Sequence, residues 1–291
     1  MKTKNFNLIF ILLFQIYSTL FYAQENNFEF LPQGLHFLPI KGNNEEARIG
    51  ILYYHKNGNL KVDIGNNIDI LAFNFPNFNS KLTLSIEFMA YALSTNYAEK
   101  RLQIDALDGF FGGNTAFSKK YESGKLISRF RIIHNSAHFV DGHFDMHNNS
   151  WIRNERPIPF TKDFGELLAG YQFDENFGSI RTYTAVSYST LIRPSILKKW
   201  HSFFGFEIST NKLINKVFEK ETNIFWANHY SLEGNPKYQL NFNNLIGLKF
   251  GKMDDKGLIF YLSYFYGSNP FSEYFSQRVS QVGLGFFVDF I

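Results

Sequence analysis

The sequence predicts an all-β protein, an antiparallel transmembrane β-barrel of about 12 strands, within a range of about 10–14. Three observations predict this fold. After Ala47, apolar and polar residues alternate with a period of two, the spacing at which side chains point to opposite faces of a sheet. Several alternating runs reach ten or more residues, which is the length that a tilted strand needs to cross a bilayer. No helical pattern with good caps interrupts them.

The composition excludes several other classes of protein. Hydrophobic residues make up 45% of the 291 residues, too many for a disordered chain. The mean hydropathy of −0.20 excludes a bundle of membrane helices, each of which needs about 20 consecutive apolar residues. With no cysteine, the chain has no disulfide, no thiolate metal site and no lipoprotein anchor. A net charge of +3, to which Lys2 and Lys4 contribute, does not favour nucleic acid as a partner.

Residues 1–23 are typical of a cleaved signal peptide. Lys2 and Lys4 precede the apolar run Leu8–Phe14, and Ala23 supplies a small residue before a polar start. The alternative is a retained anchor helix. The polar residues near the end of this segment argue against it. We therefore expect an exported chain and, for a membrane barrel, a location in the outer membrane of a Gram-negative bacterium.

Residues 24–46 differ from the alternating remainder of the chain. Pro32 and Pro39 exclude a central strand here, because proline cannot donate a hydrogen bond to a sheet. We expect this segment to be a periplasmic lead-in or a partial plug, and we expect the barrel itself to span residues 47–291.

Twelve segments show the strand pattern, and 143–156 is a further candidate. Turn signals between them include Asn57-Gly58, Asn66-Asn67 and Asp141-Gly142. The twelve segments are 47–55, 60–74, 82–91, 102–117, 125–139, 164–173, 179–192, 202–210, 222–231, 238–250, 257–266 and 281–290.

The segment 125–139 shows which of its faces should meet lipid. Arg129 and Arg131 lie on one face, and arginine facing hydrocarbon is costly. We therefore expect both arginines in the lumen and the opposite row on the outside. That outward row is apolar at first and becomes polar at His134, followed by Ser136 and His138.

A polar cluster between residues 134 and 156 is the strongest candidate site. His134 and His138 are four residues apart, as are His143 and His147. On a strand such a pair is separated by roughly 13 Å, too far to chelate one metal ion. A cross-strand metal site of His138 with Asp145 stays open, but we expect no metal and no cofactor. Other polar residues of the cluster are Asp141, Asn148, Asn149, Asn154 and Glu155.

A second interpretation of the cluster is nucleophilic catalysis. His134 and Ser136 face the same way on one strand, so the imidazole can serve as the base for the hydroxyl. The orienting third group depends on the strand register. A tight hairpin at Asp141-Gly142 places His147 opposite Ser136 and Asp145 opposite His138. A longer loop instead returns Asn154 or Glu155 beside His134.

The string His134-Asn135-Ser136 resembles the His-x-Ser dyad of two outer-membrane acyl hydrolase families, outer membrane phospholipase A and lipid A 3-O-deacylase. In both, the dyad lies on an outward strand face at the membrane boundary, and an Asn or Glu from the neighbouring strand completes it. The resemblance implies a lipid substrate. It covers only these residues.

A broader resemblance is to the bacterial family known as domain of unknown function 1207. It implies an exported envelope protein without assigning an activity. Here Gly142 stands where the family pattern has a second acidic residue after Asp141. The residues that carry it are Phe30-Leu31-Pro32, Phe37-Leu38-Pro39, Glu46-Ala47-Arg48, Arg131 to Asp141, and Tyr264 to Phe275.

These observations leave three functions open. The first is a non-enzymatic pore or envelope scaffold. The second is an acyl hydrolase acting on phospholipid or lipid A, and the third is a lipid-binding or secretion-partner barrel that uses residues 139–160. The expected partners are the lipid bilayer and lipopolysaccharide. Arg129 and Arg131 have two alternative roles: they bind lipopolysaccharide phosphates, or they pair with lumen carboxylates such as Glu87 and Glu166.

Overall fold

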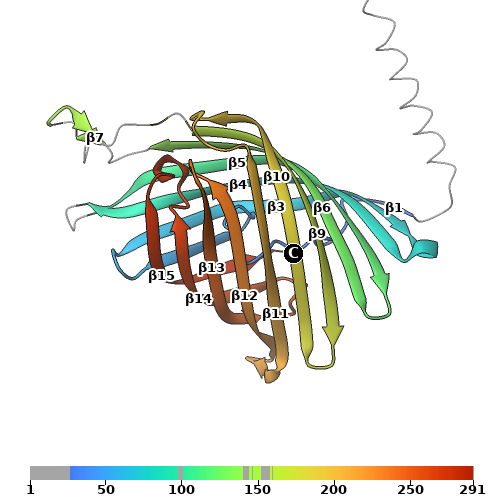
Figure 1. Cartoon of the computed structure of the whole chain (residues 1–291). Coiled ribbons are helices and arrows are strands. Elements are labelled where there is room, and N and C mark those ends of the chain that lie inside the picture. Colours follow the sequence, from blue (N-terminus) through green and yellow to red (C-terminus); the bar gives the residue numbers. More distant parts are fainter. Residues whose placement is uncertain are drawn as a thin grey trace, which may run out of the picture.

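The computed structural model describes residues 27–97, 101–139, 144–145, 147–151, 158 and 160–290. Its main sheet has 13 strands, of which β1 lies on the edge of β3 while the other 12 close on themselves through the pairing of β3 with β4. The prediction of an antiparallel barrel of about 12 strands is confirmed. Figure 1 shows the strands wrapped around one lumen.

The barrel strands follow one another in chain order around the lumen. They are β2 (Ile49–Tyr54), β3 (Asn59–Phe75), β4 (Ser80–Tyr97), β5 (Arg101–Tyr121), β6 (Gly124–Phe139), β9 (Phe160–Glu175), β10 (Gly178–Arg193), β11 (Trp200–Val217), β12 (Lys220–Gly234), β13 (Tyr238–Phe250), β14 (Gly257–Ser268) and β15 (Arg278–Asp289). The remaining elements are β1 (Phe28–Phe30), the short ladder of β7 (Phe144–Asp145) with β8 (Ser150–Trp151), and the 3₁₀ turns η1 (Pro76–Phe78) and η3 (Ser272–Tyr274).

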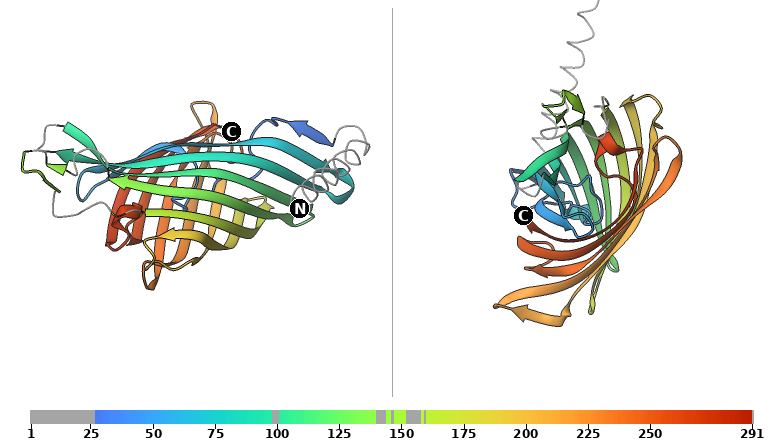
Figure 2. Two further views of the ribbon diagram at one scale, coloured as in Figure 1. Left: turned by 90° about the horizontal axis from the view of Figure 1, so that it is seen from above. Right: turned by 90° about the vertical axis from the view of Figure 1, so that its left-hand side faces the viewer.

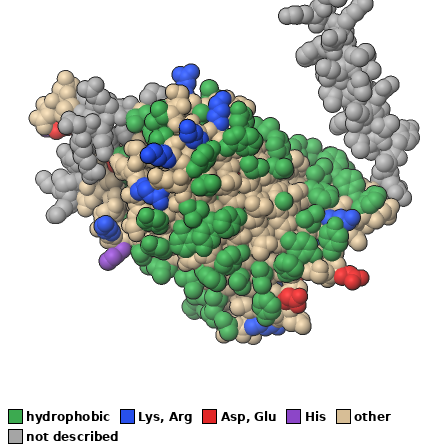
Figure 3. Space-filling model, viewed as in Figure 1, with side chains coloured by type: hydrophobic (Ala, Val, Ile, Leu, Met, Phe, Trp, Pro, Cys, Tyr) green, Lys and Arg blue, Asp and Glu red, His purple; other side chains and the backbone are tan. Residues whose placement is uncertain are grey.

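The two faces of the wall differ in polarity. Ile132 of β6 and Leu284 of β15 are 63% and 65% exposed, and both belong to the outward row of their strand. Arg129, Arg131 and Glu166 face the lumen and are buried. This is the inverse of a soluble barrel, in which the apolar row fills the interior. Apolar side chains cover much of the visible wall in Figure 3, with charged groups toward its margins.

An aromatic row crosses four adjacent strands on the outside of the barrel. Phe204 of β11 stacks on Tyr230 of β12 with ring centroids 5.0 Å apart. Tyr230 lies 5.1 Å from Phe242 of β13, which lies 6.0 Å from Tyr264 of β14. Such a band suits the boundary between hydrocarbon and water, where one end of an aromatic side chain is apolar and the other is wet.

The connections at the two ends of the barrel differ in length. One end, the turn end, carries the short connections 122–123, 176–177 and 218–219, together with the start of β2 and the end of β15. The opposite end, the loop end, carries the longest connections, 140–159 and 269–277. Strands β3 to β6 extend farther than β13 to β15, and Figure 2 shows this unequal stagger from above.

Two sequence expectations about local structure are wrong. Asn66-Asn67 is no turn but lies inside β3, with Asn67 buried on the lumen face. Asn66 Oδ1 accepts the backbone N–H of Asn67 at 2.9 Å, because β2 is too short to pair with this part of β3. The described residues of the candidate strand 143–156 form the β7–β8 ladder and do not join the barrel.

The long edge of β3 beyond β2 is covered in part by β1. Phe28–Phe30 pair with residues 71–73 of β3. The segment whose prolines exclude a central strand therefore contributes one short edge strand, which ends at Phe30, two residues before Pro32. The proposed signal peptide, 1–23, lies outside the described residues. In the described part of the chain no helix is long and apolar enough to cross a bilayer.

Replacing Ile132 by arginine tests whether the apolar row faces lipid. We expect I132R to lower the free energy of unfolding in phospholipid vesicles by about 2–4 kcal/mol, because a charge would enter the hydrocarbon. The control is I132A, which removes apolar area without adding charge. Urea titrations of both variants measure the difference, and equal stabilities for I132R and I132A would contradict the outward placement.

Candidate functional site

The lumen contains the N-terminal segment 31–48, which we call the plug. After β1, the backbone N–H of Leu31 still donates to Ile70 O of β3 at 2.8 Å, and the N–H of His36 donates to Asp69 Oδ2 on the lumen face at 2.8 Å. Phe37 and Ile40 are then buried in the interior. The plug ends where β2 begins.

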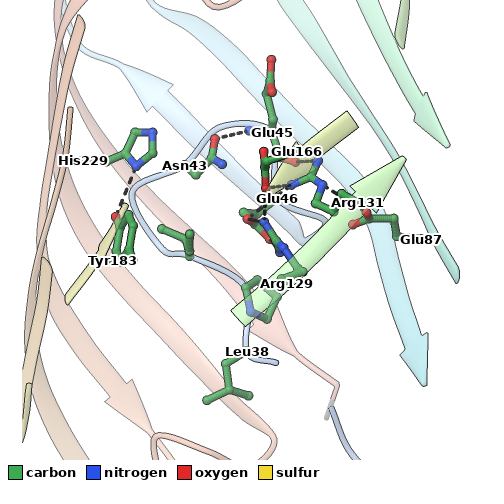
Figure 4. A network of polar contacts seen from close by, with 12 residues as sticks. Leu38, Asn43, Glu45, Glu46, Glu87, Arg129, Arg131, Glu166, Tyr183 and His229 are labelled. Atoms are coloured by element: carbon green, nitrogen blue, oxygen red, sulfur yellow. Dashed lines mark hydrogen bonds and ion pairs between the residues drawn. The ribbon is translucent and has the colours of Figure 1, made fainter. Parts of the chain in front are cut away.

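Glu46 is the central anchor of the plug. Arg129 of β6 donates two hydrogen bonds to its carboxylate, at 2.8 and 2.6 Å. Arg131 approaches the same carboxylate at 3.4 Å. Glu166 lies 2.9 Å from Arg129 and Glu87 lies 3.2 Å from Arg131, so wall carboxylates take up the remaining side of each guanidinium. Figure 4 shows Glu46 enclosed by this network.

This network decides between the two roles considered for Arg129 and Arg131. Both side chains are 1% exposed and pair with lumen carboxylates. Neither is therefore available to lipopolysaccharide phosphates. The bidentate geometry of the Arg129–Glu46 pair is the strong form of such a contact, because two parallel charge-assisted bonds fix orientation as well as distance.

A second anchor joins the plug to β10 and β11. Arg181 donates to the carbonyl oxygens of Leu38 and Pro39 at 2.8 and 3.1 Å, and to Glu207 Oε2 at 2.6 Å. Glu207 also accepts the backbone N–H of Lys41 at 2.6 Å, and its other oxygen lies 3.6 Å from Lys41 Nζ. The plug is thus tied to both sides of the lumen.

The plug is also held in shape by its own residues and by β13. The guanidinium of Arg48 donates to the carbonyl oxygens of Lys41 and Ile40 at 3.2 and 3.5 Å, and also to that of Asn43. Asn243 Nδ2 donates to Gly42 O at 2.7 Å. These bonds satisfy backbone carbonyls that would otherwise be buried without partners.

The charges around the plug fix the protonation of Glu46. Burial raises the pKa of this carboxyl, but Arg129, Arg131 and Arg48 outweigh burial and hold the pKa at about 2. Because the folded pKa lies below the ordinary value of 4.5, the anchor is fully formed above about pH 4.5 and is lost only as the pH falls through about 2. Burial lowers the pKa of Lys41, with Glu207 opposing it.

Two cavities lie on opposite sides of the plug. The cavity toward the turn end has a volume of about 550 Å³ and is lined by Leu38 and Lys41 of the plug. The cavity toward the loop end has a volume of about 100 Å³ and is lined by Gly42–Glu45. The described linings of the two cavities have no residue in common. Residues 38–45 therefore form the partition between them.

The outward polar cluster has a different geometry from the one expected. Strand β6 pairs with β9, so Ser136 lies opposite Thr161 and His134 lies opposite Asp163. The tight register at Asp141-Gly142 is therefore wrong. His134 Nδ1 lies 2.5 Å from Asp163 Oδ1, and the imidazole packs on Phe111 with ring centroids 4.9 Å apart.

His138, Asp145 and His147, which the structure describes, do not gather around His134. His138 is exposed on the outer face of β6. Asp145 begins the turn of the β7–β8 ladder, where it accepts the backbone N–H of His147 at 2.9 Å. Asp141 and Asn154 lie outside the described residues. Among the residues that the structure does describe, no three metal-ligating side chains converge.

Sequence reasoning missed the two acidic residues that organise these sites. Glu46 entered only as part of the resemblance Glu46-Ala47-Arg48, although its position after two prolines and before the first strand was a usable signal. Asp163 was missed because the strand was expected to start at residue 164, whereas β9 starts at Phe160. An acid on an otherwise apolar outward row would have identified it.

The fold and the lumen together define a transmembrane β-barrel with an internal plug. No family model and no curated protein matches the chain. Among solved structures the chain is similar to "Low pH structure of Pseudomonas putida OprB", with 5% sequence identity, a TM-score of 0.31, and coverage of 82% of this chain and 89% of that chain. At this TM-score the likeness carries no argument; the barrel is established by its own strand pairings.

Replacing Glu46 by glutamine tests the anchor, with the adjacent Glu45 as a matched control. Because the chain has no cysteine, a nitroxide at Asn44→Cys reports plug mobility by electron paramagnetic resonance. We expect E46Q to mobilise the label, since breaking a buried ion pair costs about 3–5 kcal/mol. E45Q loses only a partly exposed contact with Lys162, worth about 1 kcal/mol or less.

The same label follows the pH dependence. It should stay immobile above about pH 4.5 and gain mobility as the pH falls toward about 2. Equal mobility in E45Q and E46Q, or release of the plug near neutral pH, would contradict the assignment of Glu46 as the anchor.

Proposed function

We propose that this protein is an outer-membrane pore of a Gram-negative bacterium that is closed at rest by its own N-terminal segment. The observation that carries the proposal is the partition of the lumen by residues 38–45, with a cavity on each side. A scaffold barrel needs no polar cavities at both ends. A partition held by ion pairs, rather than by apolar packing alone, can be released without unfolding the wall.

The orientation follows from the connections. In outer-membrane barrels short turns are periplasmic and long loops are extracellular, so the turn end faces the periplasm. Export requires the signal peptide expected at residues 1–23. The exposed basic side chains of Lys56, Lys199 and Lys237 lie at the loop end, where they would meet lipopolysaccharide phosphates. Membership of the domain of unknown function 1207 family stays a prediction.

Planar-bilayer conductance tests the pore. Wild-type protein should be nearly silent at neutral pH, and a variant lacking residues 24–46 should conduct at least about tenfold more, because the partition is gone. Since the deletion also removes β1, E46Q serves as a second variant with the full chain, and E45Q as its control. If the folded deletion variant and E46Q are both as silent as wild type, the pore is excluded in favour of a scaffold.

A second candidate function is supported by the contact of His134 with Asp163. With Nδ1 held by Asp163 at 2.5 Å, the Nε2 atom of His134 is the basic one, as in a Ser-His-acid triad. Ser136 lies two residues along the same outward face. It would attack the carbonyl of a lipid ester while its proton passes to His134 and then to the leaving alcohol; water would release the fatty acid by the same route.

Release of fatty acid from phospholipid and lipid A vesicles tests this second function. We expect S136A and D163N each to lower the rate at least about a hundredfold. The control is S128A, on the same outward row of β6. An unchanged rate in S136A, or no release by the wild-type protein from either lipid, would exclude the hydrolase.

A further inference from the structure

The cavity toward the loop end, which we call the chamber, lies between two segments that fold into the lumen. Gly42–Glu45 of the plug form one side, and residues 268–270, Ser272 and Phe275 form part of the other. Its volume of about 100 Å³ exceeds the roughly 30 Å³ that one water takes up in the liquid. The chamber therefore suits one small molecule.

The loop 269–277 is fixed across the lumen rather than extended into solvent. The backbone N–H of Ser272 donates to Asp108 of β5 at 3.1 Å. The hydroxyl of Tyr91 on β4 donates to Pro270 O at 2.8 Å. Neither β4 nor β5 is a neighbour of β14 or β15 in the sheet. The loop is thus a second partition, and the chamber is bounded on two sides by chain that crosses the barrel.

The two carboxylates among the described lining residues of the chamber already have partners. Glu45 lies 3.2 Å from Lys162 Nζ, and Glu233 accepts hydrogen bonds from Ser231 Oγ and Asn235 Nδ2 at 3.0 and 3.1 Å. Lys198 also lines the chamber, but it is exposed. A charged ligand would therefore find no buried counter-charge free among the described lining residues, and burying an unpaired charge is costly. The chamber therefore selects an uncharged ligand.

The uncharged lining is rich in groups that both donate and accept hydrogen bonds. A carboxamide offers an N–H donor and a carbonyl acceptor side by side, which matches a hydroxyl group. Aromatic side chains such as Tyr91 and Phe265 add apolar faces. Six asparagines take part in the lining: Asn43, Asn44, Asn235, Asn241, Asn243 and Asn269.

One wall atom of the chamber is buried without a hydrogen bond. His201 Nε2 has no hydrogen-bond partner among the described residues, because Glu233 at 3.8 Å is beyond hydrogen-bond distance. The side chain of His201 is 13% exposed. A buried polar atom of this kind needs a partner, and a hydroxyl group in the chamber would supply one once the imidazole turns toward it.

We propose that the chamber binds a neutral, hydroxyl-rich molecule of monosaccharide size. The carboxamides and His201 take its hydroxyl groups, and the aromatic rings take its C–H faces. This inference rests on the proposed pore function, because the chamber would be a stopping point for a solute that crosses the lumen. The solute would bind there before it reached the plug. Binding itself requires only the plugged protein.

Isothermal titration calorimetry on the purified full chain tests the proposal. The detergent must carry no sugar headgroup, so lauryldimethylamine oxide is suitable. The probes are D-mannose, mannose 6-phosphate, L-glutamate and L-lysine. We expect saturable binding of mannose, at least about tenfold tighter than that of each charged probe.

Two variants locate the site. N44W fills the chamber from the plug side and should weaken mannose binding at least about tenfold. H201F should also weaken mannose binding, because the imidazole is lost. S179W, which narrows the other cavity, is the matched control and should bind as wild type does. Tighter binding of a charged probe, no binding of mannose, or equal losses in N44W and S179W would each overturn the proposal.

The failure of this inference and the failure of the pore can be told apart. Mannose binding with no conductance in the plug-deletion variant would leave the chamber standing and remove the pore. Conductance of the deletion variant with no mannose binding to the intact protein would do the opposite.

Discussion

Two arginines buried in the barrel wall set the conditions for the rest of the structure. Arg129 and Arg131 cannot face lipid, and inside the barrel their guanidinium groups need carboxylates to make burial tolerable. Glu87 and Glu166 supply part of this requirement from the wall. Glu46 supplies the rest, and it lies on the N-terminal segment. The bidentate contact with Glu46 therefore brings residues 31–48 into the lumen and makes the plug part of the barrel interior.

Period-two alternation was sufficient to predict the barrel. Each of the twelve predicted segments corresponds to one strand, because polar-in and apolar-out alternation is imposed by the two solvents that the wall separates. The same reasoning placed Arg129 and Arg131 inside. The turn signal at Asn66-Asn67 was wrong, because this turn-forming pair lies within β3. There Asn66 caps its neighbour's N–H, and Asn67 faces a polar lumen that tolerates it.

The candidate sites were less predictable because they depend on contacts between distant parts of the chain. Nothing local in Glu46 shows that its partners lie on β6, 83 residues later. The partner of His134 depends on the register of β6 with β9, which the 140–159 connection does not encode. The expected partners from residues 145–155 were too close in sequence, since the returning strand starts only at Phe160. Asp163 takes that place because pairing resumes after a long loop.

The structure thus describes a wall that is stable in lipid and an interior that is partitioned twice, by the plug and by the 269–277 loop. Carbodiimide crosslinking in intact membranes tests most directly whether the plug occupies the lumen. The account predicts an isopeptide bond between Glu45 and Lys162, whose charged atoms lie 3.2 Å apart, detected by mass spectrometry. Recovery of the Lys249–Asp289 link within the barrel wall without any Glu45–Lys162 link would contradict it.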